Sequence, residues 1–215
     1  YSGPSGKKYS MLNHYISELG VVSLSELYSA FNTGVIIGGI CIAIFFFGFS
    51  FIFRGTLGKV GSIIGSFSGI FGTLVGFFPW DGNSKMHVIS ATGFFYGGMI
   101  SIFLLTLALI LEKNEVLPKY LILLGIIGTI CFILFNYNIV DFIIAFLNRE
   151  PSGNYSLERI RPDGFWGIAF FEWMSFISFA VWLLCAAIEY KKYIIRMKIF
   201  EKHDISNPPL RSATI

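Results

Sequence analysis

The sequence predicts an all-α fold, a polytopic membrane helix bundle with five spans. Hydrophobic residues make up 54% of the 215 residues and charged residues only 13%. A typical soluble domain has about 25% charged residues. Five apolar runs also reach the roughly 20 residues that a helix needs to cross the hydrocarbon core. They are Phe31–Phe53, Val60–Pro79, Val88–Leu111, Tyr120–Val140 and Phe165–Tyr190.

These runs divide the chain into an extracytoplasmic segment over residues 1–30, a membrane helix bundle over 31–190 and a basic cytoplasmic tail over 191–215. The orientation follows from the excess of Lys and Arg that cytoplasmic segments carry. If all five runs span, two connections and the tail lie on one side, with Arg54, Lys59, Lys113, Lys119, Lys191, Lys192, Arg196, Lys198 and Lys202. We therefore expect a multi-pass protein of the cell membrane with a cytoplasmic C-terminus.

An odd number of spans places the two ends of the chain on opposite sides of the membrane. The N-terminal segment then needs a route across the bilayer, and a preceding span is the simplest one. The chain also begins with Tyr1 rather than Met. We therefore expect six spans in all, with the first span absent from this chain.

The second run carries the clearest packing signal, a stripe of glycines at spacings of four, four, three and four. Glycine allows the backbones of neighbouring membrane helices to approach closely. The stripe consists of Gly61, Gly65, Gly69, Gly72 and Gly76, and the pairs Gly34/Gly38 and Gly93/Gly97 repeat the spacing. We expect close packing within the bundle, with a dimer interface as the alternative.

The last two runs contain polar residues that need an explanation. In the fourth run Asn136, Asn138 and Asp141 precede a further apolar stretch. We expect this helix to reach the outer interface near Asp141 and then to continue or to lie in the headgroup layer. Glu172 has apolar neighbours on both sides in the fifth run. A carboxylate in a span costs about 2.5–3.5 kcal/mol on insertion scales, so Glu172 should face the interior and have a partner.

Other polar residues near the outer boundary are candidate partners of Glu172. His14 and Glu18 would share one face if their segment were helical, because they are four residues apart. Asp81 follows Pro79 and Trp80 at the end of the second run, and His87 begins the third. We expect Glu172 to lie within direct or water-mediated reach of at least one of these residues or Asp141, and preferably of a histidine. The candidate catalytic residues are therefore His14, Glu18, Asp81, His87 and Glu172.

Several classes of site are not indicated by the sequence. It has no His-Glu-x-x-His pattern, no Cys/His cluster and no phosphate-binding loop. Cys41, Cys131 and Cys185 all lie within spans, which argues against a disulfide framework or a zinc cluster. The net charge of +3 is too small and dispersed to indicate nucleic acid. We therefore predict no cofactor, no metal and no nucleic acid; the expected partners are membrane lipids and other membrane protein subunits.

The segment Asn13-His14-Tyr15-Ile16-Ser17-Glu18-Leu19-Gly20 and the later Gly76-Phe77-Phe78-Pro79, with His87 downstream, resemble a known family. It is the prokaryotic and archaeal multi-span membrane family called domain of unknown function 998. More distantly, the layout is similar to the Frag/DRAM/Sfk group of six-span eukaryotic proteins. In the prokaryotic family a span precedes the Ile-Ser-Glu-Leu-Gly segment, so the resemblance also implies a missing first span. The resemblance implies a membrane architecture, and it assigns no catalytic residues to this chain.

Three functions remain open. The first is a non-enzymatic membrane component, either an accessory or scaffold subunit or a lipid-binding protein, whose polar residues are satisfied internally. The second is an outward-facing membrane-embedded hydrolase acting on a lipid-linked or amphiphilic substrate, with a histidine as the base and an acidic residue as the acid. The third is a small-solute transporter, which needs interrupted spans and a path that continues inward.

Overall fold

A computed structural model describes residues 8–112, 117–147 and 164–206, and the described part is helical with short connections. Five long helices are apolar enough to cross a membrane, which confirms the predicted all-α, multi-pass fold. Two short 3₁₀ helices, η1 (Ile16–Gly20) and η2 (Ser50–Ile52), lie outside them. The long helices are α1 (Tyr28–Phe49), α2 (Thr56–Phe77), α3 (Ser84–Leu111), α4 (Tyr120–Leu147) and α5 (Gly167–Ser206).

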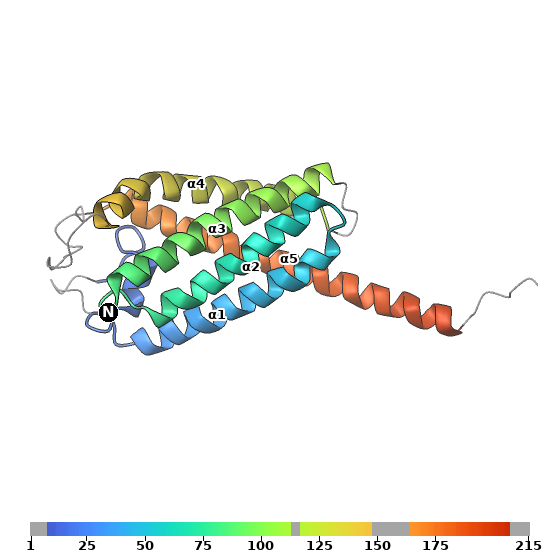
Figure 1. Cartoon of the computed structure of the whole chain (residues 1–215), viewed down its shortest axis with the longest axis horizontal. Helices are drawn as coiled ribbons and strands as arrows, with labels where there is room; N and C mark the ends of the chain where they lie inside the picture. Colours follow the sequence, from blue (N-terminus) through green and yellow to red (C-terminus); the bar gives the residue numbers. More distant parts are fainter. Residues whose placement is uncertain (1–7, 113–116, 148–163, 207–215) are drawn as a thin grey trace, which may run out of the picture.

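The helices run alternately up and down, and each packs mainly against its neighbours in sequence (Figure 1). Helix α2 lies between α1 and α3, while α4 joins α3 to α5. Residues 8–27 fold over one end of the bundle, which we call the N-terminal end. Helix α5 projects beyond the opposite end, which we call the tail end (Figure 1). Because α5 has 40 residues, it is about 60 Å long, roughly twice the hydrocarbon thickness.

The glycine stripe of α2 packs as predicted. All five glycines are buried. A Cβ on Gly65 would lie 2.6 Å from Ser101 Oγ in α3 and 2.7 Å from Phe46 Cγ in α1. Close approach also brings polar groups together, because Ser66 donates to the Ala43 carbonyl at 2.9 Å and Ser68 donates to the Phe94 carbonyl at 2.8 Å. The small residues therefore hold α2 tightly between two helices.

Two of the other expected glycine contacts are absent. A Cβ on Gly34 or Gly38 would meet no atom within 4 Å, so the expectation of close packing is wrong for this pair. Gly93 and Gly97 do pack against α2, at Phe71 and Ser68. Spacing alone does not distinguish the pairs, because close packing also requires a helix opposite the glycines. Gly34 and Gly38 instead border an open space.

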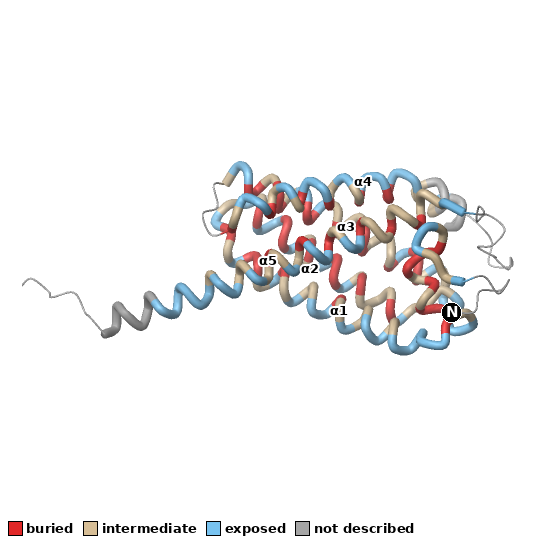
Figure 2. Tube along the Cα trace, turned by 180° about the vertical axis from the view of Figure 1, so that it is seen from behind, coloured by how far each residue is buried: buried red, intermediate tan, exposed pale blue. Residues whose placement is uncertain are grey.

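The core of the bundle is aromatic and lies toward the tail end. Figure 2 shows the buried positions on the facing sides of the helices, while the outward sides are exposed. Phe46 stacks at centroid distances of 6.0 Å on Phe179 and 6.3 Å on Trp182. The Trp182 indole also donates to the Leu121 carbonyl at 3.1 Å. These contacts join α1, α4 and α5 and close the bundle at this depth.

The tail end of the bundle is fixed by a helix cap. Glu112, at the end of α3, accepts hydrogen bonds from the backbone amides of Leu57 at 2.9 Å and Gly58 at 3.4 Å. These amides belong to the first turn of α2, where carboxylates are favourable. This contact places the end of α3 beside the start of α2 at the tail end. Helix α5 projects beyond the same end (Figure 1). The arrangement agrees with successive connections that alternate between the two ends of the bundle.

Candidate functional site

Residues 8–27 fold against the start of α5. The backbone amide of Trp166 donates to the Leu12 carbonyl at 2.8 Å. The Trp173 indole donates to the His14 carbonyl at 3.2 Å. Within the segment, the Glu18 carboxylate accepts the amide of Tyr15 at 2.9 Å and caps η1. Because η1 begins at Ile16, His14 lies before it, and the shared helical face expected for His14 and Glu18 does not form.

Glu172 connects this segment to the interior of the bundle. Its side chain is buried, and Oε2 accepts the backbone amide of Ile16 at 2.7 Å. Within the described residues, the structure gives the other oxygen, Oε1, no hydrogen-bond donor. The Glu18 carboxyl group is close enough to interact electrostatically with Glu172. Glu172 therefore has one satisfied oxygen and one that is free to accept a hydrogen bond.

His87 lies in the first turn of α3 and is held by the preceding loop. Its Nδ1 lies 2.8 Å from the Phe78 carbonyl, which only accepts, so this nitrogen carries the proton. Its Nε2 is then the acceptor of the neutral ring. The Trp80 ring meets the imidazole edge-on at a centroid distance of 5.6 Å. The loop thus fixes both the tautomer and the orientation of His87.

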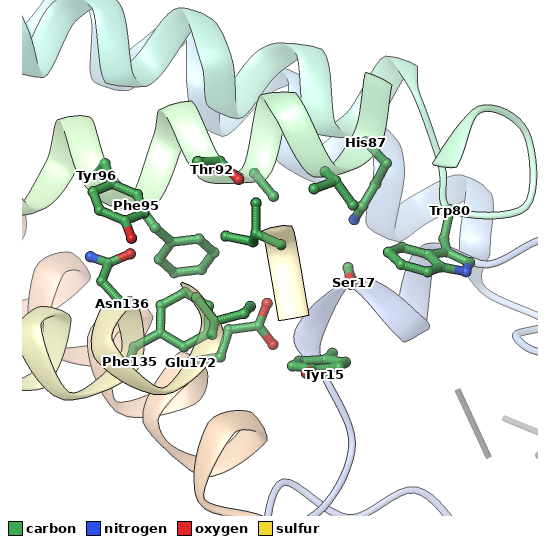
Figure 3. Close-up of a pocket in the computed structure, with 14 residues that line it drawn as sticks. Tyr15, Ser17, Trp80, His87, Thr92, Phe95, Tyr96, Phe135, Asn136 and Glu172 are labelled. Carbon is green, nitrogen blue, oxygen red and sulfur yellow. The ribbon is translucent and has the colours of Figure 1, made fainter. Parts of the chain in front are cut away.

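Glu172 and His87 line two adjacent cavities, which we describe as two lobes because they share five lining residues. The larger lobe, of about 350 Å³, lies among α1, α2, α3 and α5 beneath η1. The smaller lobe, of about 50 Å³, extends toward α4. Figure 3 shows the Glu172 carboxyl group pointing into the smaller lobe, with Ser17 and His87 beyond it. Both lobes share the residues Ser17, His87, Ala91, Phe95 and Glu172.

The larger lobe opens sideways between α1 and α5. Its α1 wall runs from Ala30 through Gly34 and Gly38 to Ile42, which is about 18 Å of helix. Ala30 and Gly34 are exposed, and Phe176 on α5 is 39% exposed. One turn deeper, Phe46 and Phe179 meet and close the space toward the tail end. The exposed residues therefore place the opening of the larger lobe on the side of the bundle, between its two ends.

The other candidates have different positions. Asp81 is exposed and accepts the amides of Val22 at 3.3 Å and Ser23 at 3.1 Å, so it joins two loops outside the cavity. His14 is buried with its ring against Tyr9 and does not line the cavity. The Asp141 side chain lies outside the described residues. The expected direct hydrogen bond between Glu172 and a histidine is absent among the described residues, because Glu172 accepts the Ile16 amide instead; a water-mediated contact stays a prediction.

Several polar residues of the smaller lobe are not among the candidate residues expected from the sequence. Its lining also includes Tyr15, Ser17, Thr92, Tyr96 and Asn136. Asn136 is buried and its amide nitrogen donates to Met99 Sδ at 3.4 Å, while its Oδ1 has no partner among the described residues. A polar residue inside an apolar run is a signal that could have placed Asn136 at the site. Ser17, Thr92 and Tyr96 give no such signal, because hydroxyl groups are common in membrane helices.

Comparison with known families agrees with the architecture. A protein-family model described as "Protein of unknown function (DUF998)" matches residues 1–189. The chain belongs to the DUF998 family. No curated protein and no solved structure matches it. The matched range contains every residue that lines the cavity, whereas the part of α5 beyond residue 189 lies outside the DUF998 match.

The described residues contain no group of three or more His, Cys, Asp or Glu side chains that could hold a metal ion. Glu172 and His87 are nevertheless suited to other chemistry. A carboxyl group and an oriented imidazole can bind a polar ligand or exchange protons with it. The site thus offers polar groups at the N-terminal end of an apolar cavity.

Proposed function

We propose that this DUF998 protein is a lipid-binding membrane protein that takes up a single-chain amphiphile from the bilayer. The observation that carries the proposal is the lateral cavity between α1 and α5. Its volume of about 350 Å³ falls within the range of small-molecule sites. Apolar side chains dominate the larger lobe, while Glu172 and His87 lie near the N-terminal end. A ligand would place its chain beside Gly34 and Gly38 and its polar head near Glu172.

The free acceptor groups support binding over a purely structural role. A scaffold subunit needs buried polar groups that are satisfied internally, because an unpaired group in an apolar interior is costly. In the described residues, Glu172 Oε1 and Asn136 Oδ1 lack such partners. A bound ligand would supply the missing donors.

The shape of the cavity argues against transport. A transporter needs a path that continues past the site. Here Phe46, Phe179 and Trp182 pack together one turn beyond the deepest lining residues. The cavity is a dead end, which suits a ligand that enters and leaves sideways.

Photolabelling tests the proposal. The probe is dodecanol with a diazirine in its chain, added to the purified protein in phosphatidylcholine nanodiscs. Labelled peptides should map to α1 between Ala30 and Ile42 and to α5 near Phe176. The double variant Gly34→Leu/Gly38→Leu should lower this labelling at least fivefold, because the new side chains extend into the cavity from positions where an added Cβ meets no atom within 4 Å.

Ile37→Phe is the matched control. Ile37 lies on the same helix, is 57% exposed and does not line the cavity, so the larger side chain should leave the labelling unchanged. Labelling spread evenly over the lipid-facing surface, or unaffected by the double glycine variant, would contradict amphiphile binding.

A hydrolase that acts on an amphiphile in the same cavity is the second candidate. The observation in its favour is His87, whose Nδ1 is held by the Phe78 carbonyl while its Nε2 is left as an acceptor. This is the arrangement of an oriented general base. Glu172 in the same cavity would serve as the acid. Turnover of dodecyl acetate that His87→Gln abolishes, while photolabelling persists, would favour this candidate.

We also propose that the bundle lies in the cell membrane with the tail end in the cytoplasm. The Lys and Arg residues near the tail end support this orientation. The cavity would then open toward the outer leaflet. Membrane lipids are the partners that the site itself suggests, and association with other membrane protein subunits remains a further proposal.

A further inference from the structure

The chemistry of the smaller lobe suggests which head group it takes, if the cavity binds an amphiphile as proposed. Three acceptor atoms there have no donor among the described residues, and the hydroxyl groups of Ser17, Thr92 and Tyr96 line the same lobe. Glu172 Oε1 is a carboxyl oxygen, and Asn136 Oδ1 is an amide oxygen whose nitrogen already contacts Met99. His87 Nε2 is an acceptor because Nδ1 holds the proton. A fitting ligand therefore brings hydrogen-bond donors.

The charges of the lining favour a cation. The described residues that line the two lobes include Glu172 but no Lys or Arg. Glu18 adds a second carboxyl group that interacts electrostatically with Glu172. A phosphate or sulfate head would meet hydroxyl groups in the smaller lobe, but it would also meet the Glu172 carboxyl group with no Lys or Arg as a counter-charge. A positive head would instead neutralise a buried carboxylate, which is the condition for keeping such a charge in a membrane interior.

The aromatic lining adds a further attraction for a cation. The rings of Tyr15, Trp80, Phe95, Tyr96 and Phe135 line the smaller lobe (Figure 3). The faces of aromatic rings attract ammonium groups, and aromatic cages are a common means of binding them. Phe95 and Phe135 pack at a centroid distance of 4.5 Å, and Tyr15 packs against Trp166 at 4.9 Å, so these rings are held in place.

We propose that the smaller lobe binds the primary ammonium head of a single-chain membrane amine. The N–H donors of that head suit the acceptor atoms of the lining, first of all Glu172 Oε1, and its positive charge suits a Glu172 carboxylate. The alkyl chain extends into the larger lobe along α1. The proposal assigns Glu172 as the residue that selects the head group, while the depth and opening of the larger lobe select a single chain.

Competition against the diazirine-dodecanol probe tests this assignment in the same nanodiscs. The competitors share a twelve-carbon chain and differ only in their heads: dodecylamine, dodecyltrimethylammonium, dodecanol and dodecyl phosphate. Dodecylamine, charged at neutral pH as lysine is, should compete at least tenfold better than dodecanol. Dodecyltrimethylammonium should fall between them, since it has the charge but no N–H donor, and dodecyl phosphate should compete least.

Glu172→Gln should reduce the preference for amine over alcohol at least tenfold. Comparing variants in identical membranes removes differences in how the competitors partition into lipid. Glu112→Gln is the matched control, because Glu112 has one carboxyl oxygen that accepts backbone amides and one without a partner among the described residues, but lies at the tail end. It should leave the preference unchanged. If Glu172→Gln does not fold, Asn136→Leu provides a second test and should reduce the same preference at least threefold.

The two proposals fail in different ways. If the probe does not label the cavity, amphiphile binding itself is refuted. If the probe labels the cavity but dodecylamine competes no better than dodecanol, the ammonium assignment is refuted while binding stands. The ammonium assignment is also refuted if dodecyltrimethylammonium competes as well as dodecylamine. It is likewise refuted if the folded Glu172→Gln protein keeps its preference for the amine over the alcohol.

Discussion

Gly65 offers the most direct test of how α2 is packed. A Cβ at this position would lie 2.6 Å from Ser101 Oγ and 2.7 Å from Phe46 Cγ, well inside the roughly 3.5–4.0 Å of normal carbon contact. Phe46 is fully buried against Phe179 and Trp182, so it has little room to move. Gly65→Leu must therefore separate α2 from α1 or α3.

The size of the effect follows from the cost of overpacking, about 1–3 kcal/mol in a well-packed core. Leucine adds three carbons beyond the Cβ, which places Gly65→Leu near the upper end. For a protein of this size each kcal/mol lowers Tm by about 2–4 °C. We expect Gly65→Leu to lower Tm by about 6–12 °C and Gly65→Ala to lower it by less, measured by thermal unfolding in detergent.

The matched control is the same substitution at a glycine without neighbours. Gly34→Leu introduces a side chain where no atom lies within 4 Å, so Tm should stay within about 2 °C of the wild type. Equal losses at Gly34 and Gly65 would show that the loss at Gly65 does not come from the close packing of α2. Wild-type stability of Gly65→Leu would refute the described packing.

Three further predictions concern other parts of the bundle. Glu112→Ala should cost about 1 kcal/mol in thermal unfolding, since the first amides of α2 lose their cap, and wild-type stability would show that the cap is dispensable. Trp182→Ala should cost about 3–5 kcal/mol because it empties the aromatic core and frees the Leu121 carbonyl, so a loss below 1 kcal/mol would contradict that packing. With the native cysteines removed, Ser23→Cys should react with an impermeant thiol reagent on intact cells and Lys198→Cys only after permeabilisation, and the reverse pattern would invert the proposed orientation.

The sequence determined the membrane fold because span length and hydropathy are local properties of the chain. A run of about 20 apolar residues has only one favourable structure in a bilayer, a helix. The same reasoning identified Glu172 and His87 as unusual, because polar residues in or beside a span need a partner. The glycines of α2 could also be interpreted correctly, since their spacing places them on one face.

Only the tertiary structure decided what those residues meet. Gly34/Gly38 and Gly93/Gly97 have the same spacing, yet one pair lines a cavity and the other packs against α2. Asp81 and Glu172 are both acidic residues near the N-terminal end, but one joins two exposed loops and the other points into the interior. Which helices are neighbours, and at what depth α1 and α5 separate, depends on contacts between distant residues. Those contacts form the cavity, and no local pattern encodes them.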